Sequence, residues 1–169
     1  REPTWAPFSR ELWSSREQEQ AVVYGTAKGE DLTLSPYSQP EANHLEVTSN
    51  CKVTENGALS GTLLVKTDGT PDTSLRRALA SRGADARKEY FAGMINQIVP
   101  GAKIQTLTFT EPDDFKKPCE VNIRFTADNY ISSGKEFAYA KFPSFTKSFK
   151  KTLCGDLPDA AKLATRKYP

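Results

Sequence analysis

The sequence predicts an α+β domain: a mainly antiparallel sheet of about five strands, a helix pair on one face, and an irregular N-terminal arm. Three observations lead to this class. Residues 45–67 alternate apolar and polar side chains around a turn, residues 72–98 repeat apolar side chains at helical spacing, and residues 104–142 return to strand-like segments. The predicted order is two strands, two helices and three strands, and a β-sandwich with inserted helices is the alternative.

The first 43 residues predict an arm, because prolines and glycines interrupt them repeatedly. Their one helical signal is the capping box Ser14-Ser15-Arg16-Glu17, in which a hydroxyl and a carboxylate satisfy each other's backbone N–H groups. It predicts one short helix from about Ser15 to Val22.

A β-hairpin follows the arm. Leu45–Val53 alternates apolar and polar residues, and Ala58–Thr67 supplies the second strand. Between them lies Glu55-Asn56-Gly57. Asn-Gly is a strong hairpin signal that favours a type I′ turn.

Two helices are predicted next. Asp72 is a suitable N-cap, and Leu75, Ala78 and Leu79 recur at helical spacing before Gly83. A second helix is expected from about Asp85 to Ile98, ended by Pro100-Gly101. Each has one apolar stripe, so each should pack one face on the sheet.

Three more strands are expected at Ile104–Thr110, Val121–Ala127 and Glu136–Phe142, and short connections suggest an antiparallel meander. Ser144–Lys151 is compatible with a basic strand or with a loop anchored by Phe145 and Phe149. Asp159–Arg166 is a short helical candidate.

Composition excludes several classes of protein. Twenty-three Lys and Arg against 21 Asp and Glu leave a formal net charge of +2, without the basic excess of a nucleic-acid-binding domain. No stretch approaches the roughly 20 apolar residues of a membrane-spanning helix. Neither the P-loop motif nor the glycine-rich dinucleotide-binding motif is present in the sequence. We expect no nucleic-acid partner, no membrane span and no cofactor.

The residue types for thiol catalysis are present but not in a catalytic arrangement. A cysteine nucleophile needs an adjacent base, and the only imidazole is His44. Cys51 follows at an odd offset along the same predicted strand, so the two side chains should point to opposite faces. We therefore expect that this chain is not itself an enzyme, and that Cys51, Cys119 and Cys154 are buried structural thiols with at most one disulfide.

No metal site is expected either. The cysteines and His44 do not show zinc-ligand spacing. The acidic segment Glu111-Pro112-Asp113-Asp114 offers oxygen ligands of the kind that calcium takes. A solvated turn is the favoured interpretation of that segment.

The chain also resembles a known family, most sharply over residues 1–44. The matching segments are Glu2-Pro3-Thr4-Trp5, Leu12-Trp13-Ser14-Ser15, Glu17-Gln18 and Pro40-Glu41-Ala42-Asn43-His44. They are similar to the junction, in large Bacteroidetes proteins, between a transglutaminase-like domain with a Cys-His-Asp triad and a following domain of unknown function. Farther along, the likeness is a pattern of elements: the hairpin, the Arg76-Arg77 helix and the closing Arg166–Pro169.

This resemblance implies that residues 1–43 are an irregular arm carrying the tail end of a missing transglutaminase-like domain, and that residues 44–169 are an α+β accessory domain. Glu2 would take the position of the triad Asp, while the nucleophile and its His would lie upstream. Any transglutaminase-like or cysteine-protease-like activity would belong to that upstream domain. Such proteins are expected in the periplasm or on the cell surface.

The implied function is a non-catalytic accessory domain that packs on or positions the upstream catalytic domain of the same polypeptide. The aromatic residues Trp5, Phe8 and Trp13 are the interface candidates. Capping the core of this domain is the favoured interpretation of these side chains, and stacking on a sugar is a further alternative. A glycan- or peptide-binding module is therefore the alternative function.

Overall fold

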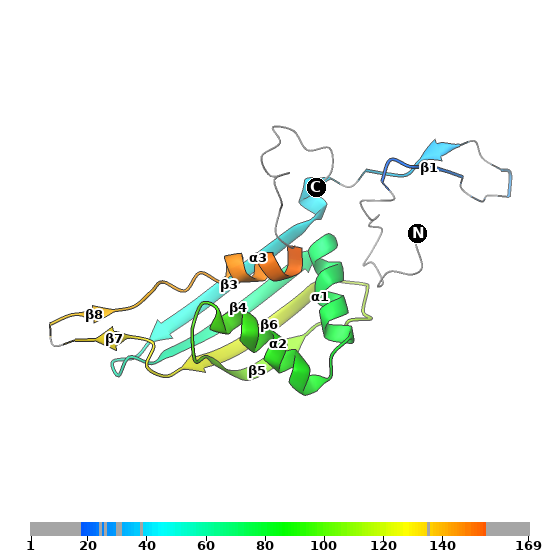
Figure 1. Cartoon of the computed structure of the whole chain (residues 1–169). Coiled ribbons are helices and arrows are strands. Elements are labelled where there is room, and N and C mark those ends of the chain that lie inside the picture. Colours follow the sequence, from blue (N-terminus) through cyan, green and yellow to red (C-terminus); the bar gives the residue numbers. More distant parts are fainter. Residues whose placement is uncertain are drawn as a thin grey trace.

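The computed structural model describes residues 18–23, 25, 27–29, 32–37, 39–134 and 136–154. Several expectations fall outside these ranges: the triad position at Glu2, the aromatic residues Trp5, Phe8 and Trp13, the capping box, and the short helix at 159–166. Within the described residues the chain is an α+β structure, as the sequence predicts (Figure 1).

The arm contains a small ribbon where the sequence predicted the end of a helix. Strands β1 (Ala21–Val22) and β2 (Thr33–Leu34) pair antiparallel. Ser35 fixes the ribbon: its N–H donates to Gln20 O at 2.8 Å, and its Oγ accepts the Gln20 N–H at 2.9 Å. Because residues 19–22 pair with the opposite strand of the ribbon, the predicted helix is wrong over that part.

The predicted hairpin is confirmed as β3 (His44–Val53) and β4 (Leu59–Asp68). Its turn differs from the type I′ prediction, because Gly57 is the turn residue with positive φ, at 79°. Thr54 O accepts the Gly57 N–H at 2.9 Å, and Thr54 N donates to Ala58 O at 2.9 Å. This is a three-residue loop in which a left-handed glycine forms a bulge.

Both predicted helices are confirmed, as α1 (Thr70–Ala80) and α2 (Ala84–Asn96). Asp72 is not the N-cap of α1; it lies in the first turn with 0% exposure. The capping oxygen comes instead from Asn43, whose Oδ1 accepts the Thr70 N–H at 2.9 Å. A residue distant in sequence performs the local role that the pattern had assigned to Asp72.

The main sheet has four antiparallel strands in the order β3-β4-β6-β5, with β5 at Lys103–Phe109 and β6 at Cys119–Ala127. The third predicted strand, at 136–142, lies outside this sheet: only Ala138–Tyr139 (β8) is strand, paired with Ser132–Ser133 (β7) in a separate ribbon. The reason is topological. Since β6 has β4 and β5 on its two sides, it offers no free edge to a following strand.

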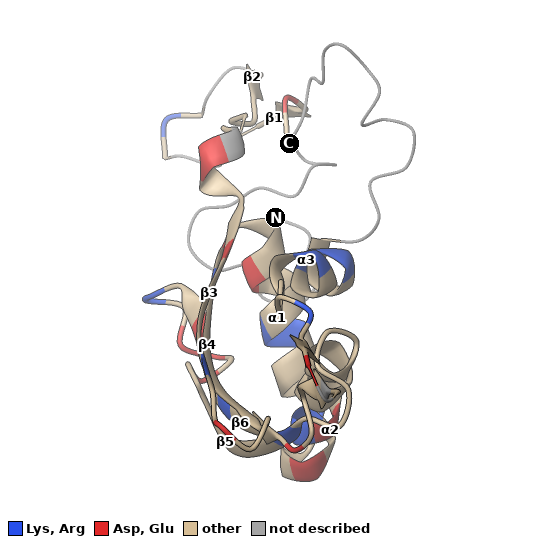
Figure 2. Ribbon diagram, turned by 90° about the vertical axis from the view of Figure 1, so that its left-hand side faces the viewer, with Lys and Arg blue, Asp and Glu red and all other residues tan. Residues whose placement is uncertain are grey.

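The helices cover one face of the sheet. Figure 2 shows the sheet as a curved layer with α1, α2 and a third helix, α3 (Thr146–Cys154), on its concave side. The sequence left residues 144–151 as a strand or loop, yet Phe145, Phe149 and Leu153 are spaced by four and are all buried. The Ser148 hydroxyl donates to Met94 O at 2.9 Å and joins α3 to α2.

Between sheet and helices lies a hydrophobic cluster, which includes Leu63, Val65, Phe91, Ile95, Ile123, Phe125 and Phe149. This arrangement, one sheet with helices on one face, departs from the β-sandwich alternative. No helix in the described part of the chain has the length and apolar composition to cross a membrane.

Candidate functional site

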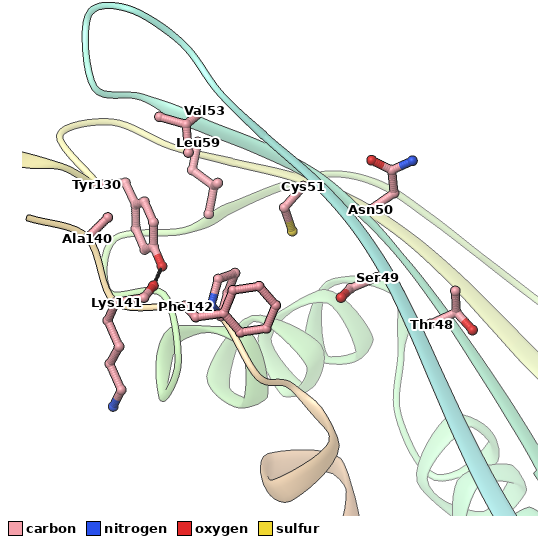
Figure 3. Close-up of a pocket in the computed structure, with 11 residues that line it drawn as sticks. Thr48, Ser49, Asn50, Cys51, Val53, Leu59, Tyr130, Ala140, Lys141 and Phe142 are labelled. Atoms are coloured by element: carbon pink, nitrogen blue, oxygen red, sulfur yellow. Dashed lines mark hydrogen bonds between the residues drawn. The ribbon is translucent and has the colours of Figure 1, made fainter.

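An open pocket of about 640 Å³ lies on the concave side of the second half of β3. Figure 3 shows Cys51 directed toward Tyr130 and Phe142 across it. The pocket joins three separate segments: residues 48–51 and Val53 of β3 with Leu59 of β4, Tyr130 after β6, and residues 140–143 before α3. The last segment forms the wall that faces the sheet.

Local contacts hold the pocket open from both ends. The Tyr130 hydroxyl donates a hydrogen bond to Lys141 O, and the Ile131 N–H donates to Gly57 O at 3.0 Å. At the other end, Phe145 stacks edge-on against Phe125 with ring centroids 5.6 Å apart. Residues 140–143 are thereby held between two anchored points.

The lining suits binding rather than reaction. Apart from Lys141, its side chains are uncharged at neutral pH, and Val53, Leu59 and Phe142 supply apolar walls. Burial raises the pKa of the Cys51 thiol. Burial also raises the pKa of Tyr130, with smaller contributions from Cys51 and Tyr139. A nucleophilic cysteine needs the opposite shift.

The other cysteines are no better placed for catalysis. Burial raises the pKa of Cys119 to about 12, and nearby Arg76 offsets this only in part. Burial likewise raises the pKa of Cys154, while Lys150 lowers it in part. All three cysteines are free thiols, and Cys154 is exposed rather than buried as expected. His44 begins β3, at an odd offset from Cys51 on the same strand.

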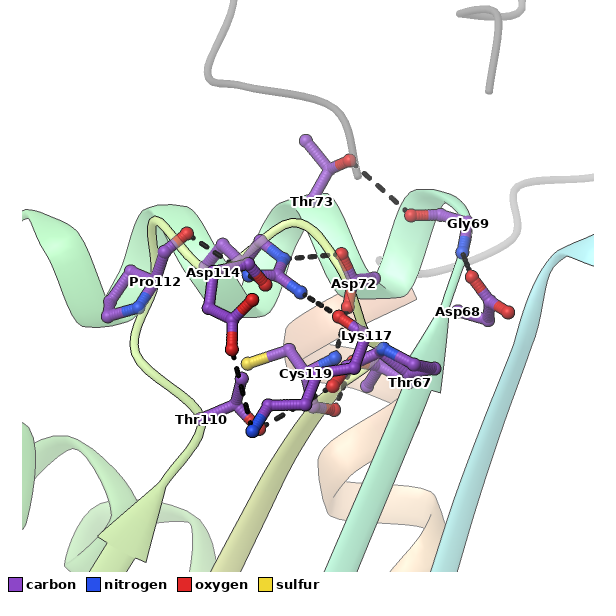
Figure 4. Close-up of polar contacts among 12 residues, drawn as sticks. Thr67, Asp68, Gly69, Asp72, Thr73, Thr110, Pro112, Asp114, Lys117 and Cys119 are labelled. Atoms are coloured by element: carbon purple, nitrogen blue, oxygen red, sulfur yellow. Dashed lines mark hydrogen bonds and ion pairs between the residues drawn. The ribbon is translucent and has the colours of Figure 1, made fainter. Parts of the chain in front are cut away.

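The acidic loop at 111–114 is a turn that exposes Glu111 and Asp113 to solvent, while a cation from α1 holds its backbone. The Arg76 guanidinium donates to the carbonyl oxygens of Pro112 at 3.1 Å, Asp114 at 3.0 Å and Lys117 at 2.6 Å. Figure 4 shows these loop residues gathered beside Asp72, which pairs with Arg76 at 2.7 Å. The predicted solvated turn is therefore present, and the contact of its backbone with Arg76 is the feature that its own composition did not indicate. No group of three or more His, Cys, Asp or Glu in the described ranges is placed to hold a metal ion.

A second surface feature lies on the arm. Val23, Leu32 and Leu34, here called the arm patch, are 66%, 69% and 64% exposed. They belong to or flank the β1–β2 ribbon, which Figures 1 and 2 show away from the main sheet and its helices. The sequence indicated the aromatic residues of the arm as interface candidates, and no pattern in it marked these aliphatic ones.

Sequence reasoning also missed the pocket, because its residues come from segments that are distant along the chain. The available signal was the cluster of aromatic residues between 137 and 145. Comparisons with known proteins found no matching family model, curated protein or solved structure.

Proposed function

We propose that this chain is a non-catalytic accessory domain that packs on, and positions, a transglutaminase-like domain preceding it in the same polypeptide. The proposal combines the family resemblance of residues 1–44 with one structural observation, the arm patch. In keeping with the resemblance, the protein would act in the periplasm or on the cell surface.

The arm patch supports docking for a physical reason. A two-stranded ribbon with no cover is only marginally stable in water, and clustered exposed aliphatic side chains are typical of interaction surfaces. Burying one such Val or Leu side chain contributes about 1.5–3 kcal/mol. The ribbon precedes the α+β unit in the chain, on the side where a preceding domain would meet it.

Replacing Leu32 and Leu34 together by lysine is expected to uncouple the two domains of the full-length polypeptide. Both side chains are more than 60% exposed, so the change should leave the stability of the α+β unit within about 0.5 kcal/mol. Rotational correlation times from NMR relaxation would measure the coupling. Phe137→Lys, at an equally exposed apolar residue beside the β7–β8 ribbon, is the control and should leave the domains tumbling together.

Independent tumbling of the two domains in the unmodified full-length polypeptide would contradict this function. So would equal effects of the arm-patch variant and the Phe137 control, because the coupling would then not depend on the arm.

The pocket favours a second candidate function, a peptide-binding module. Its walls are largely apolar and its volume suits one large side chain with flanking backbone. Phe142 is 85% exposed although it lines the pocket, as expected of a side chain that a ligand would cover. A glycan is the alternative ligand, since Tyr130 and Phe142 also present aromatic faces.

Phe142→Ala is expected to weaken peptide binding by at least about tenfold, the effect of losing one well-covered anchor. Screening the unmodified chain against a peptide library and a glycan array would identify the ligand class, and titration calorimetry would compare variants. Phe137→Ala, also highly exposed but outside the pocket lining, is the matched control. No binding to either collection would reject the ligand-binding function.

A further inference from the structure

The two edges of the main sheet differ in how they are protected. Strand β5, at one edge, has an irregular register between Ile104 and Thr106, and such bulges discourage further strand pairing. Strand β3, at the other edge, keeps a regular register over ten residues. Within the described part of the chain its backbone pairs only with β4. The β3 edge is thus open to another strand.

Along β3, residues that bond to β4 alternate with residues whose backbone N–H and C=O groups are free to bond another strand. The Thr54 N–H donates to Ala58 O, and hydrogen-bonded pairs in an antiparallel ladder alternate with pairs that are not bonded. Lys52 and Asn50 therefore bond to β4, in register with Ser60 and Thr62. The N–H and C=O groups of the odd-numbered residues 45–53 point away from the sheet.

The side chains of this edge complement a second copy of the same edge. We propose that the chain forms a two-fold dimer in which β3 pairs antiparallel with β3 of another copy, with the axis at Ser49. Odd residues then meet odd residues, so the open backbone groups of both copies bond to each other. The two four-stranded sheets become one continuous sheet across an isologous interface.

On the outer face of the sheet this register pairs opposite charges. Glu46 stands opposite the partner's Lys52, and by symmetry Lys52 stands opposite the partner's Glu46. Both residues are exposed. Within the described residues, the Lys52 ammonium has no hydrogen bond or ion pair, and the Glu46 carboxylate only accepts a hydrogen bond from Thr48 Oγ1 at 3.2 Å. Both charges are therefore available to pair across the axis.

The remaining positions agree with the same register. Thr48 stands opposite the partner's Asn50, so a hydroxyl meets an amide on the outer face. On the concave face, Leu45 meets the partner's Val53 and Val47 meets the partner's Cys51. Val53 is 41% exposed in the single chain and gains an apolar neighbour. Moving the axis to Thr48 places Glu46 opposite Asn50, and moving it to Asn50 places Glu46 opposite Thr54, so either shift loses both charge pairs.

Charge-reversal variants test the dimer by sedimentation equilibrium. Glu46→Lys alone, or Lys52→Glu alone, places like charges at both symmetric positions and is expected to weaken dimerisation by about tenfold, since each cross-strand pair contributes a fraction of a kcal/mol to about 1 kcal/mol. An equimolar mixture of the two single variants is expected to dimerise like the unmodified chain, because both pairs become attractive again. The double variant should recover in the same way.

Glu89→Lys and Lys88→Glu are the matched controls, with the same charge changes at neighbouring exposed positions of α2. They should leave dimerisation unchanged, and circular dichroism verifies folding of every variant. A chain that stays monomeric up to millimolar concentration overturns the proposal and leaves the β3 edge to a peptide or another domain. The proposal is also overturned if the single charge reversals leave the dimer dissociation constant unchanged, or if mixing the two single variants does not restore it.

Discussion

Replacing Arg76 by methionine is expected to lower the free energy of unfolding by about 3–5 kcal/mol, the loss typical of removing one partner from a buried ion pair. Arg76 is 1% exposed and Asp72 is fully buried. Arg76 Nε donates to Asp72 Oδ2 at 2.7 Å. Without the guanidinium, the Asp72 carboxylate would remain buried with no opposite charge.

The effect is large because Arg76 serves two purposes. Its terminal nitrogens donate to the carbonyl oxygens of residues 111, 112, 114 and 117, while Asp72 Oδ1 accepts the Cys119 N–H at 2.5 Å. The pair therefore ties the loop between β5 and β6 to the first turns of α1. Unpaired buried carbonyl groups add to the cost of the lost charge.

Urea unfolding measures the free energy of unfolding of each variant. Equal dependence of that free energy on urea concentration shows that the variants expose the same surface on unfolding and can be compared. The stability of Arg76→Lys should lie between those of Arg76→Met and the unmodified chain, because an ammonium retains the charge but cannot reach Asp72 and the loop carbonyls at once. Lys88→Met, at an exposed residue of α2, is the control and should change stability by less than about 0.5 kcal/mol. A loss below about 1 kcal/mol for Arg76→Met would show that the network is not a main stabilising contact.

This network illustrates which features the sequence could predict. Helix periodicity found α1 correctly, and a rule about helix starts assigned Asp72 as its cap. The actual role of Asp72 depends on Cys119, 47 residues away, which no local pattern reveals. The loop at 111–114 was interpreted from its own composition, whereas its conformation depends on Arg76 from another element.

The hairpin and the two central helices were predictable because each is specified by adjacent residues. Helix α3 had the same kind of signal in Phe145, Phe149 and Leu153, but its lysines and the neighbouring aromatic residues suggested other structures. Strand order was beyond local reasoning, since β6 enters between β4 and β5. The pocket depends on that order, because it forms where the chain leaves β6 and passes under β3 on its way to α3.

Substituting Gly69 by alanine is expected to destabilise the chain by about 2–4 kcal/mol, through backbone strain together with the loss of a helix cap. Gly69 has φ 69° and ψ −132°, a conformation that residues with a Cβ rarely adopt. An added Cβ would lie 2.4 Å from Ala42 O and 2.5 Å from Asn43 Oδ1. The second of these atoms caps α1.

Two further variants separate the contributions at this junction. Asn43→Ala removes the oxygen that accepts from Thr70 N at 2.9 Å and Thr70 Oγ1 at 3.0 Å, and is expected to cost only about 1 kcal/mol. Gly93→Ala is the matched glycine control: nothing lies within 4 Å of its added Cβ, and inside α2 it should raise stability by about 0.5–1 kcal/mol. The same urea titration compares the two losses of stability. If Gly69→Ala destabilised the chain no more than Asn43→Ala, backbone strain and close contact at Gly69 would contribute nothing. The connection from β4 into α1 would then depend on the cap alone.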